Sequence, residues 1–180
     1  KLGDDATLSI EQIDEKWTAQ KKEVAYEEKR SLREFTVESS FWVAAESSGL
    51  HPRDIVGIIG VLEYDIDFNT EIRSGSEARL IVTELYKEGQ FVKLAAPEAL
   101  EFTNNGKKFT AIRYKNKSGN TVYYDENGLS RKGEFLRSPL PFSNVTSKFN
   151  PKRFHPILKK TRPHNGTDFG APTGTPIRSV

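Results

Sequence analysis

The fold is decided by the stretch EFTNNGKKFTAIRY, which covers residues 101–114 of the 180-residue sequence. Residues 101–103 and 109–114 are rich in β-branched and aromatic side chains, which favour extended strands. Between them lies Asn104-Asn105-Gly106-Lys107, and an Asn-Gly pair readily adopts the positive φ angles of a two-residue hairpin turn. The stretch therefore predicts an antiparallel β-hairpin.

Further strands are predicted on both sides of this hairpin. Residues 79–86 (RLIVTELY) are β-branched and aromatic, which again favours a strand. The segments between the strands are rich in Gly, Asn and Lys, as is typical of turns. The predicted turns and strands are 87–90 into 91–94, 117–120 into 121–124, and a closing turn at 125–128. The middle of the chain is therefore predicted to be an antiparallel β domain.

Two short helices are predicted before this domain. Ser39-Ser40 caps a helix over residues 41–46, which ends at Gly49. Pro52 suits the first turn of a second helix. The apolar face of the second helix is formed by Ile55, Ile58, Ile59 and Leu62. The two helices are predicted to pack on each other.

The N-terminal part of the chain gives a weaker pattern. Residues 16–30 (KWTAQKKEVAYEEKR) suit either a solvated helix, with Glu and Lys at helical spacings, or two short strands around a turn at 21–23. Residues 32–37 alternate and indicate a strand. The predicted fold class is therefore mixed α+β and multidomain.

Composition excludes several classes of function. A formal net charge of +2, evenly spread, gives no basis for nucleic-acid binding. Cysteine is absent, which excludes disulfides and thiolate–metal sites. The best apolar run, residues 55–62, is far shorter than the ~20 residues of a membrane span. Because the chain opens on Lys1 rather than Met, we expect a processed or trimmed protein.

Asp65-Ile66-Asp67-Phe68-Asn69 opens like a calcium-binding loop. Thr70 and Ser76, however, stand where such a loop needs a glycine at its sixth position and a glutamate at its twelfth. We therefore expect an ordinary turn after the apolar helix.

His164 and Asp168 form the candidate metal site. Imidazole nitrogen and carboxylate oxygen are ordinary zinc ligands at ~2.0–2.2 Å. Pro163 and Gly166 argue against a helix, and a straight strand would place the two α-carbons ~13 Å apart, too far to share one ion. A shared ion therefore requires a bend at Asn165-Gly166. Spacing alone favours an ordinary loop with an incidental His and Asp.

The surrounding sequence changes this interpretation. His164-x-Gly-x-Asp168-Phe-x-Ala-Pro-x-Gly-Thr-Pro-Ile177, with Phe154-His155-Pro156-Ile157 before it, resembles the start of the catalytic domain of lysostaphin-type (LytM) zinc endopeptidases. Those enzymes cut the peptide cross-links of bacterial cell walls. Upstream segments resemble the non-catalytic domains of multidomain Gram-negative members of this family. These segments are residues 39–50, 65–68, 109–114, 123–128 and 135–140.

The resemblance implies that His164 and Asp168 are the first two ligands of a Zn²⁺ ion. The family's third ligand and its general-base histidine come from a later His-x-His motif and another downstream histidine. This sequence contains only His51, His155 and His164. We therefore expect the missing groups beyond Val180 or on a second chain, and we expect this chain to be inactive by itself. His155 matches a position that is not a ligand, so a packing or site-wall role is expected.

The resemblance also sets the expected domain layout. Residues 1–70 would form an N-terminal accessory and inhibitory domain of helices and strands, and residues 71–140 an antiparallel β accessory domain. Residues 141–180 would form the N-terminal part of an antiparallel β LytM peptidase domain, after a joint at Ser138-Pro139-Leu140-Pro141. Asn150 stands where the family usually has glycine, which we interpret as local turn variation.

The leading hypothesis is a zinc-dependent peptidoglycan hydrolase that cleaves cell-wall cross-link peptides with metal-activated water. The alternative is a non-catalytic regulatory or wall-binding module that activates or anchors cell-wall hydrolases. Relatives of that kind usually lose the zinc ligands, whereas His164 and Asp168 are present here.

The resemblance further implies export to the periplasm or cell envelope, with envelope-membrane association through a missing N-terminal segment. In some relatives a carboxylate from the N-terminal domain caps the metal. Glu46 is the candidate for that inhibitory role, and a solvated helix residue is its alternative interpretation.

Overall fold

The computed structural model describes residues 6–13, 16–140, 144–155, 157 and 159–180. It contains two compact units, residues 1–31 with 83–95 and residues 32–82 with 96–180. Antiparallel strands dominate the described residues, and two helices accompany them. The predicted antiparallel β character and both predicted helices are confirmed.

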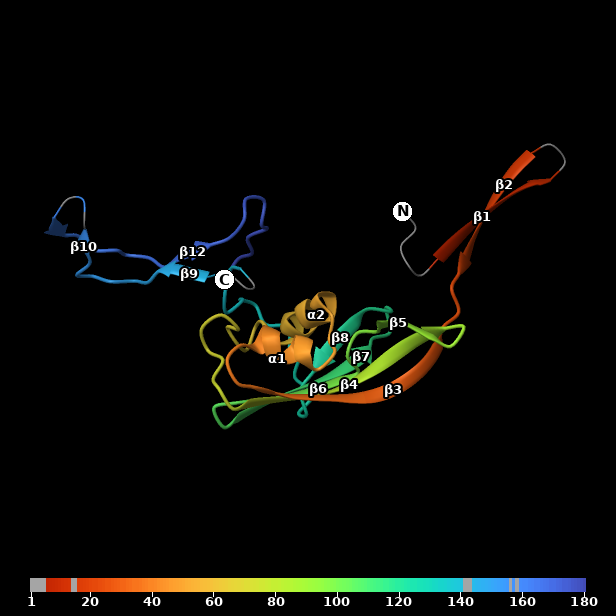
Figure 1. Cartoon of the computed structure of the whole chain (residues 1–180), viewed down its shortest axis with the longest axis horizontal. Coiled ribbons are helices and arrows are strands. Elements are labelled where there is room, and N and C mark those ends of the chain that lie inside the picture. The colour runs from red at the N-terminus through yellow and green to blue at the C-terminus, as the bar shows by residue number, and fades with distance from the viewer. Residues whose placement is uncertain (1–5, 14–15, 141–143, 156, 158) are drawn as a thin grey trace. The chain divides into compact units, whose positions relative to one another are not determined.

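The unit of residues 32–82 and 96–180 is built on a sheet with the strand order β3-β4-β6-β7-β8. Helices α1 and α2 lie over one face of this sheet (Figure 1). The hairpin predicted at residues 101–114 is the antiparallel pair β6–β7, in which Phe102 lies opposite Phe109. The bounds are β3 Glu27–Val37, α1 Phe41–Ser47, α2 Pro52–Leu62, β4 Ser76–Lys87, β6 Ala99–Asn104, β7 Lys107–Lys115 and β8 Thr121–Tyr124.

Tight turns with positive φ angles set the register of the hairpins. Asn105 has a φ of 50° and Gly106 a φ of 76° between β6 and β7. Glu88 and Gly89 take φ values of 52° and 74° in the turn from β4 to β5 (Gln90–Leu94). Two consecutive positive φ angles are the geometry of the two-residue turn that the Asn-Gly pair predicted.

The core lies between the helices and one face of the sheet. In β4, Ala78, Leu80 and Val82 are buried while residues 77, 79 and 81 are exposed, because successive side chains point to opposite faces of a strand. Leu100 and Phe102 of β6 continue the buried face. The helical side of the core contains the predicted apolar residues Ile55, Ile58, Ile59 and Leu62, all of which are buried.

An aromatic cluster fastens α1 to the sheet. The ring centroid of Phe41 lies 4.8 Å from that of Phe68 and 5.6 Å from that of Phe102, both in edge-to-face geometry. Phe68 and Phe102 stack with their centroids 6.0 Å apart. Since a helix of seven residues is unstable by itself, this packing is what holds α1 in place.

The other unit contains the hairpin of β1 (Ala6–Ile13) and β2 (Lys16–Glu23), together with β5. For residues 16–30, the strand alternative is therefore confirmed and the helix alternative is wrong. The turn predicted at 21–23 is also wrong, because β2 continues through these residues and pairs Lys21 with Leu8 and Lys22 with Thr7. The chain leaves β2 only at residues 24–26.

The loop between α2 and β4 is a hydrogen-bonded turn. The Asn69 amide donates to Asp67 Oδ1 at 2.9 Å, and the Thr70 hydroxyl donates to Asp67 Oδ2 at 2.7 Å. Both carboxylate oxygens of Asp65 lie 3.2 Å from Arg131 Nη1. The carboxylates that opened the calcium-like motif thus have protein partners, and the ordinary turn is confirmed.

The joint before the C-terminal segment packs onto this same unit. Leu136 and Leu140 are buried, and the Arg137 amide donates to the Glu63 carbonyl at 3.1 Å. The boundary expected between residues 70 and 71 falls inside the unit, because α1 and α2 pack on the sheet that contains β6 and β7. The three-domain layout stays a prediction.

Short strand pairs follow the joint. β9 (Asn144–Ser147) pairs with β12 (Asp168–Gly170), and β10 (Phe154–His155) pairs with β11 (Lys160–Thr161). Both pairs are antiparallel, and Pro141 of the predicted joint lies outside the described residues.

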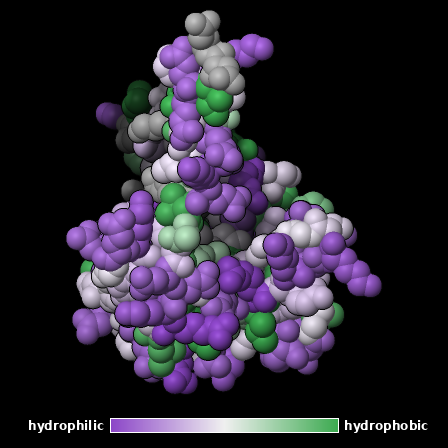
Figure 2. Space-filling view, turned by 90° about the vertical axis from the view of Figure 1, so that its right-hand side faces the viewer, coloured by the Kyte–Doolittle hydropathy of each residue, from purple (hydrophilic) through white to green (hydrophobic). Residues whose placement is uncertain are grey.

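Hydrophilic side chains predominate on the face shown in Figure 2, and hydrophobic residues interrupt them in small groups. Neither of the helices in the described ranges has the length and apolar character needed to cross a bilayer.

Candidate metal centre

His164 and Asp168 lie close together. The distance between His164 Nε2 and Asp168 Oδ2 is 3.2 Å. The His164 side chain is 19% exposed and the Asp168 side chain 57%. The pair therefore joins a mostly buried imidazole to a carboxylate that a ligand can reach from solvent.

Backbone pairing explains how the two side chains meet. His164 and Asn150 exchange both backbone hydrogen bonds, at 2.9 and 3.0 Å, while Asp168 pairs with Ser147 in the β12–β9 ladder. The chain bends at Gly166, between the two ligand candidates. The bend that a shared ion requires is thus present at the predicted place. It does not depend on glycine, because Gly166 lies outside the positive-φ region and an added Cβ would meet open space.

The imidazole of His164 is oriented by a backbone carbonyl. His164 Nδ1 lies 2.8 Å from the carbonyl oxygen of Lys148, which can only accept a hydrogen bond. Nδ1 therefore carries the proton, and in the neutral ring the lone pair is on Nε2. Nε2 and the Asp168 carboxylate are then two acceptors that face each other. A proton or a cation between them relieves their repulsion.

The spacing fits zinc. Two donors that each lie ~2.0–2.1 Å from a tetrahedral ion are about 3.3 Å apart, and the observed distance between the donor atoms is 3.2 Å. In metal-binding histidines, the ring nitrogen that does not bind the metal usually donates a hydrogen bond, often to a backbone carbonyl, as Nδ1 does here. In the part of the chain that the structure describes, no group of three or more His, Asp or Glu side chains could hold a metal ion. The described residues thus offer two candidate ligands, His164 and Asp168.

The other candidates from the sequence do not join this pair. Glu46 is exposed on α1, and no metal-binding cluster of described residues includes it. The backbone of His155 pairs with Lys160, and its side chain lies outside the described part of the structure. Asn150 is not in the left-handed region; its Oδ1 instead accepts the Lys152 amide at 2.9 Å, which closes a local turn.

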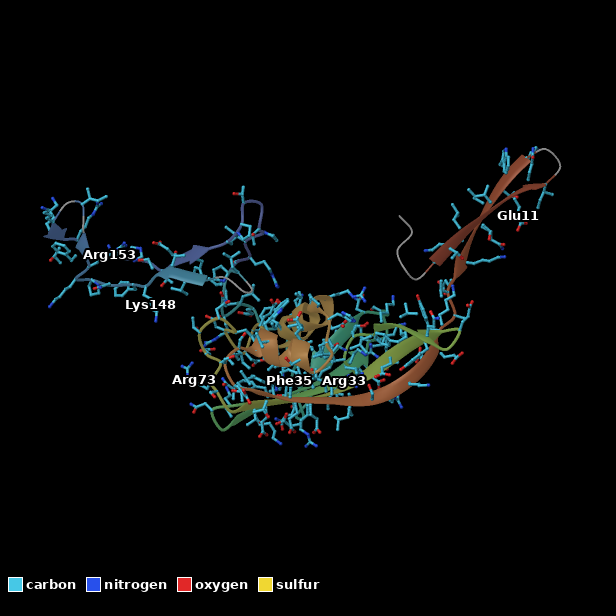
Figure 3. All side chains as sticks on the ribbon, viewed as in Figure 1. Glu11, Arg33, Phe35, Arg73, Lys148 and Arg153 are labelled. Carbon is cyan, nitrogen blue, oxygen red and sulfur yellow. The ribbon has the colours of Figure 1, made fainter. Side chains whose placement is uncertain are left out.

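Sequence reasoning missed several groups around His164. Besides the Lys148 carbonyl and Asn150, they are the Ser147 hydroxyl, 3.4 Å from His164 Nδ1, and Arg153, whose Nη1 donates to Ser147 Oγ at 3.2 Å. Figure 3 labels Lys148, directly after β9, and Arg153, directly before β10. No residue pattern could have indicated the Lys148 contact, because any residue supplies a carbonyl and only the strand register places it.

Comparison with known families accounts for the larger part of the chain. Residues 27–151 match the family described as the Csd3 second domain. The chain belongs to the Csd3 second-domain family. The Csd3 second domain includes both helices and the strands from β3 to β9. It therefore extends across the boundary expected at residue 70, and the His164–Asp168 pair follows it.

Two curated relatives of this Csd3 second-domain chain are named peptidoglycan DD-endopeptidases. Peptidoglycan DD-endopeptidase ShyC of Vibrio cholerae is 39% identical over 173 residues, which cover 95% of this chain and 39% of ShyC. Peptidoglycan DD-endopeptidase ShyA of the same organism is 34% identical over 142 residues, which cover 78% of this chain and 32% of ShyA. The chain thus spans well under half the length of these two relatives.

Solved structures share the fold of the Csd3 second-domain chain. A zinc-containing peptidase from Vibrio cholerae superposes with a TM-score of 0.57 at 29% identity, covering 97% of this chain and 52% of that one. Helicobacter pylori Csd3 superposes with a TM-score of 0.55 at 20% identity, covering 98% of this chain and 48% of that one. The first structure is that of a zinc-containing peptidase, and the comparison with the second shows a shared fold alone.

Proposed function

We propose that the protein is a zinc-dependent peptidoglycan endopeptidase of the lysostaphin (LytM) type, with His164 and Asp168 as two of its zinc ligands. One observation carries the proposal: Nε2 and Oδ2 lie at the spacing of two zinc donors while Nδ1 is already bonded to the Lys148 carbonyl. The names of the relatives, two peptidoglycan DD-endopeptidases and a zinc-containing peptidase, support the same class of enzyme.

The residues of this chain would hold and tune the metal. When bound, zinc supplies a water molecule with a pKa of about 7 and polarises a substrate carbonyl. His164 contributes a neutral donor whose direction is set by Lys148. Asp168 contributes negative charge, and its exposed side chain leaves an approach for substrate. Both roles agree with hydrolysis of a peptide bond.

The site needs further groups. A catalytic zinc site commonly uses three protein ligands, and proton transfer needs a base. We place these groups on a further segment of the polypeptide or on a second chain, so that residues 141–180 are the beginning of the peptidase domain and inactive alone. The substrate would be the cross-link peptide of peptidoglycan, and the location the periplasm or cell envelope, with membrane association through a separate segment. In this layout Glu46 remains the candidate inhibitory carboxylate.

A non-catalytic regulatory or wall-binding module is the second hypothesis. Such a module has no need for Nε2 of His164 and Oδ2 of Asp168 to lie at zinc spacing. The geometry therefore favours the enzyme.

Metal binding can be tested on this chain alone. With three histidines in the sequence, imidazole NMR signals are easily assigned by substitution. Addition of Zn²⁺ should perturb His164 selectively, with His51 and His155 as internal controls, and His164→Gln or Asp168→Asn should abolish the effect. Equal perturbation of all three histidines would refute the ligand assignment.

Activity is tested on the complete polypeptide that carries this sequence. Incubation with purified cell-wall sacculi should release cleaved cross-linked muropeptides, detected by mass spectrometry. A chelator, His164→Ala or Asp168→Ala should each reduce cleavage at least ~100-fold. Full activity of a folded His164→Ala variant would overturn the proposal.

A further inference from the structure

Two residues approach Nδ1 of His164 and a third contacts one of these two; we call the three the histidine cradle: Ser147, Lys148 and Arg153. The Lys148 carbonyl accepts from Nδ1 at 2.8 Å. Ser147 Oγ lies 3.4 Å from the same nitrogen, and Arg153 Nη1 donates to Ser147 Oγ at 3.2 Å. The first two contacts are made at Nδ1, whereas the nitrogen that faces Asp168 is Nε2.

The cradle decides which nitrogen of His164 is free. A neutral imidazole without partners populates both tautomers, and the partner of one nitrogen decides which of them carries the proton. Here Nδ1 meets a carbonyl oxygen, so the proton is drawn to Nδ1 and the lone pair is left on Nε2. The ring is thereby prepared for a metal before any metal binds.

Ser147 lies next to both ligand candidates. Its backbone is the ladder partner of Asp168, and its side chain approaches His164. The hydroxyl is restrained by Arg153, because a guanidinium donor fixes the direction from which the oxygen accepts. A second acceptor beside the Lys148 carbonyl also keeps the Nδ1 proton on the same side if the ring rotates slightly.

We propose that the histidine cradle presets His164 in the Nδ1-protonated tautomer, and that Ser147 and Arg153 are positioning residues for the metal site. The link to zinc rests on the proposed function, whereas the tautomer does not. The two parts can therefore fail separately.

The tautomer is measured on the ¹⁵N-labelled chain by long-range ¹H–¹⁵N spectra, at a pH well above the ordinary histidine pKa of ~6.5. His164, assigned with His164→Gln, should be protonated on Nδ1. Ser147→Ala and Arg153→Leu should each change the tautomer ratio about fivefold, the factor expected from loss of one net hydrogen bond. Ser147→Thr, which keeps the hydroxyl, should restore the ratio. Thr161→Ala, which removes a hydroxyl from exposed β11, is the matched control.

A wild-type His164 protonated on Nε2 would overturn the cradle, and so would an unchanged ratio in folded Ser147→Ala and Arg153→Leu. Zinc titration of the same samples gives the second readout. Affinity should fall roughly 10-fold or more in Ser147→Ala and stay unchanged in Thr161→Ala. In the complete polypeptide, which supplies the further ligands, an Nδ1-protonated His164 that zinc does not perturb would leave the cradle standing and refute the proposed function. Selective zinc binding to a His164 ring protonated on Nε2 would refute the cradle and leave the proposed function standing.

Discussion

Arg178 forms an ion pair with Glu63, which lies 115 residues earlier in the chain. Arg178 Nη1 is 2.6 Å from Glu63 Oε1 and 2.7 Å from Oε2, and the Arg178 amide donates to the Pro139 carbonyl at 3.0 Å. The segment that follows the candidate metal ligands is thus fastened to the end of α2 and to the joint.

Arg178→Gln should loosen this attachment. The ion pair is partly exposed, so its contribution to the free energy of unfolding should be small, about 0.5–1 kcal/mol. Hydrogen exchange is the more sensitive measurement, since the residue 178 amide should exchange about 3- to 10-fold faster. Lys152→Gln removes one positive charge from the same segment and serves as the control. Unchanged exchange at residue 178 would show that the ion pair does not hold the segment.

Removal of Arg131 should destabilise the fold more strongly. Its Nη1 binds both oxygens of Asp65, its Nε donates to the Thr110 carbonyl at 2.6 Å, and its side chain is 13% exposed. Arg131→Leu leaves the Asp65 carboxylate without its cation, which should lower the free energy of unfolding by about 2–3 kcal/mol. Urea denaturation measures the loss. Arg131→Lys keeps the charge but loses the several hydrogen-bond donors of the guanidinium group. Its free energy of unfolding should lie between those of the wild type and Arg131→Leu. A loss below ~0.5 kcal/mol in Arg131→Leu would contradict this role.

Asn104 should be the most sensitive polar position of the core. Its Oδ1 accepts the Ser76 hydroxyl at 2.7 Å and the Arg73 amide at 3.1 Å, and its Nδ2 donates to the Glu71 carbonyl at 3.1 Å. Asn104→Leu leaves these partners unsatisfied and should cost about 3 kcal/mol by urea denaturation. Asn116→Leu, at a half-buried position in the turn from β7 to β8, should cost less than ~1 kcal/mol. Equal losses in both variants would rule out a special role for the buried amide.

Glu71 should make stability depend on pH. Burial by itself would raise the pKa of Glu71, but the hydrogen bond from the Asp67 amide and the neighbouring Arg137 guanidinium outweigh it and lower the pKa below its ordinary value. A carboxyl group with a lowered pKa stabilises the fold above its unfolded pKa of ~4.3, and this contribution is lost as the pH falls through the folded pKa.

The corresponding variant is Glu71→Gln. It should be about 0.5–1 kcal/mol less stable than the wild type near pH 7, because the partly exposed pair is screened by solvent, and the difference should shrink towards pH 3. Urea denaturation across this pH range gives the comparison. Glu46→Gln changes an exposed carboxylate on α1 and should show no such trend. A difference that grows as the pH falls would contradict the lowered pKa.

The features predicted correctly from the sequence are those that depend on near neighbours in the chain. Asn105-Gly106 defined its own turn, and the spacing of Ile55, Ile58 and Leu62 defined the buried face of α2. Residues 16–30 could not be decided in this way, because charged and polar side chains suit a helix or an exposed strand equally. There the pairing of β2 with β1 decides, and this pairing is a contact with another segment.

In the candidate site, too, features set by near neighbours could be predicted, and features set by contacts with other segments could not. The bend between His164 and Asp168 could be predicted, because the rise per residue of a strand alone shows that a straight strand would hold the two residues too far apart to share an ion. The orientation of the imidazole could not be predicted, because it depends on which carbonyl the register of β9 places beside Nδ1. Likewise, the role of Ser147 appears only once its position opposite Asp168 is known.

The joint at residues 136–140 has a consequence for the evolution of the chain. Asn69 Nδ2 donates to the Leu140 carbonyl at 3.1 Å, Arg137 pairs with Glu71, and Leu136 and Leu140 are buried. These contacts fix how many residues fit between the two leucines, so a single insertion would displace at least one of them. Homologous sequences should therefore vary in residue type here while keeping the length constant, and Glu71 and Arg137 should change together. The joint is a spacer of fixed length, and its length is the property that selection would preserve.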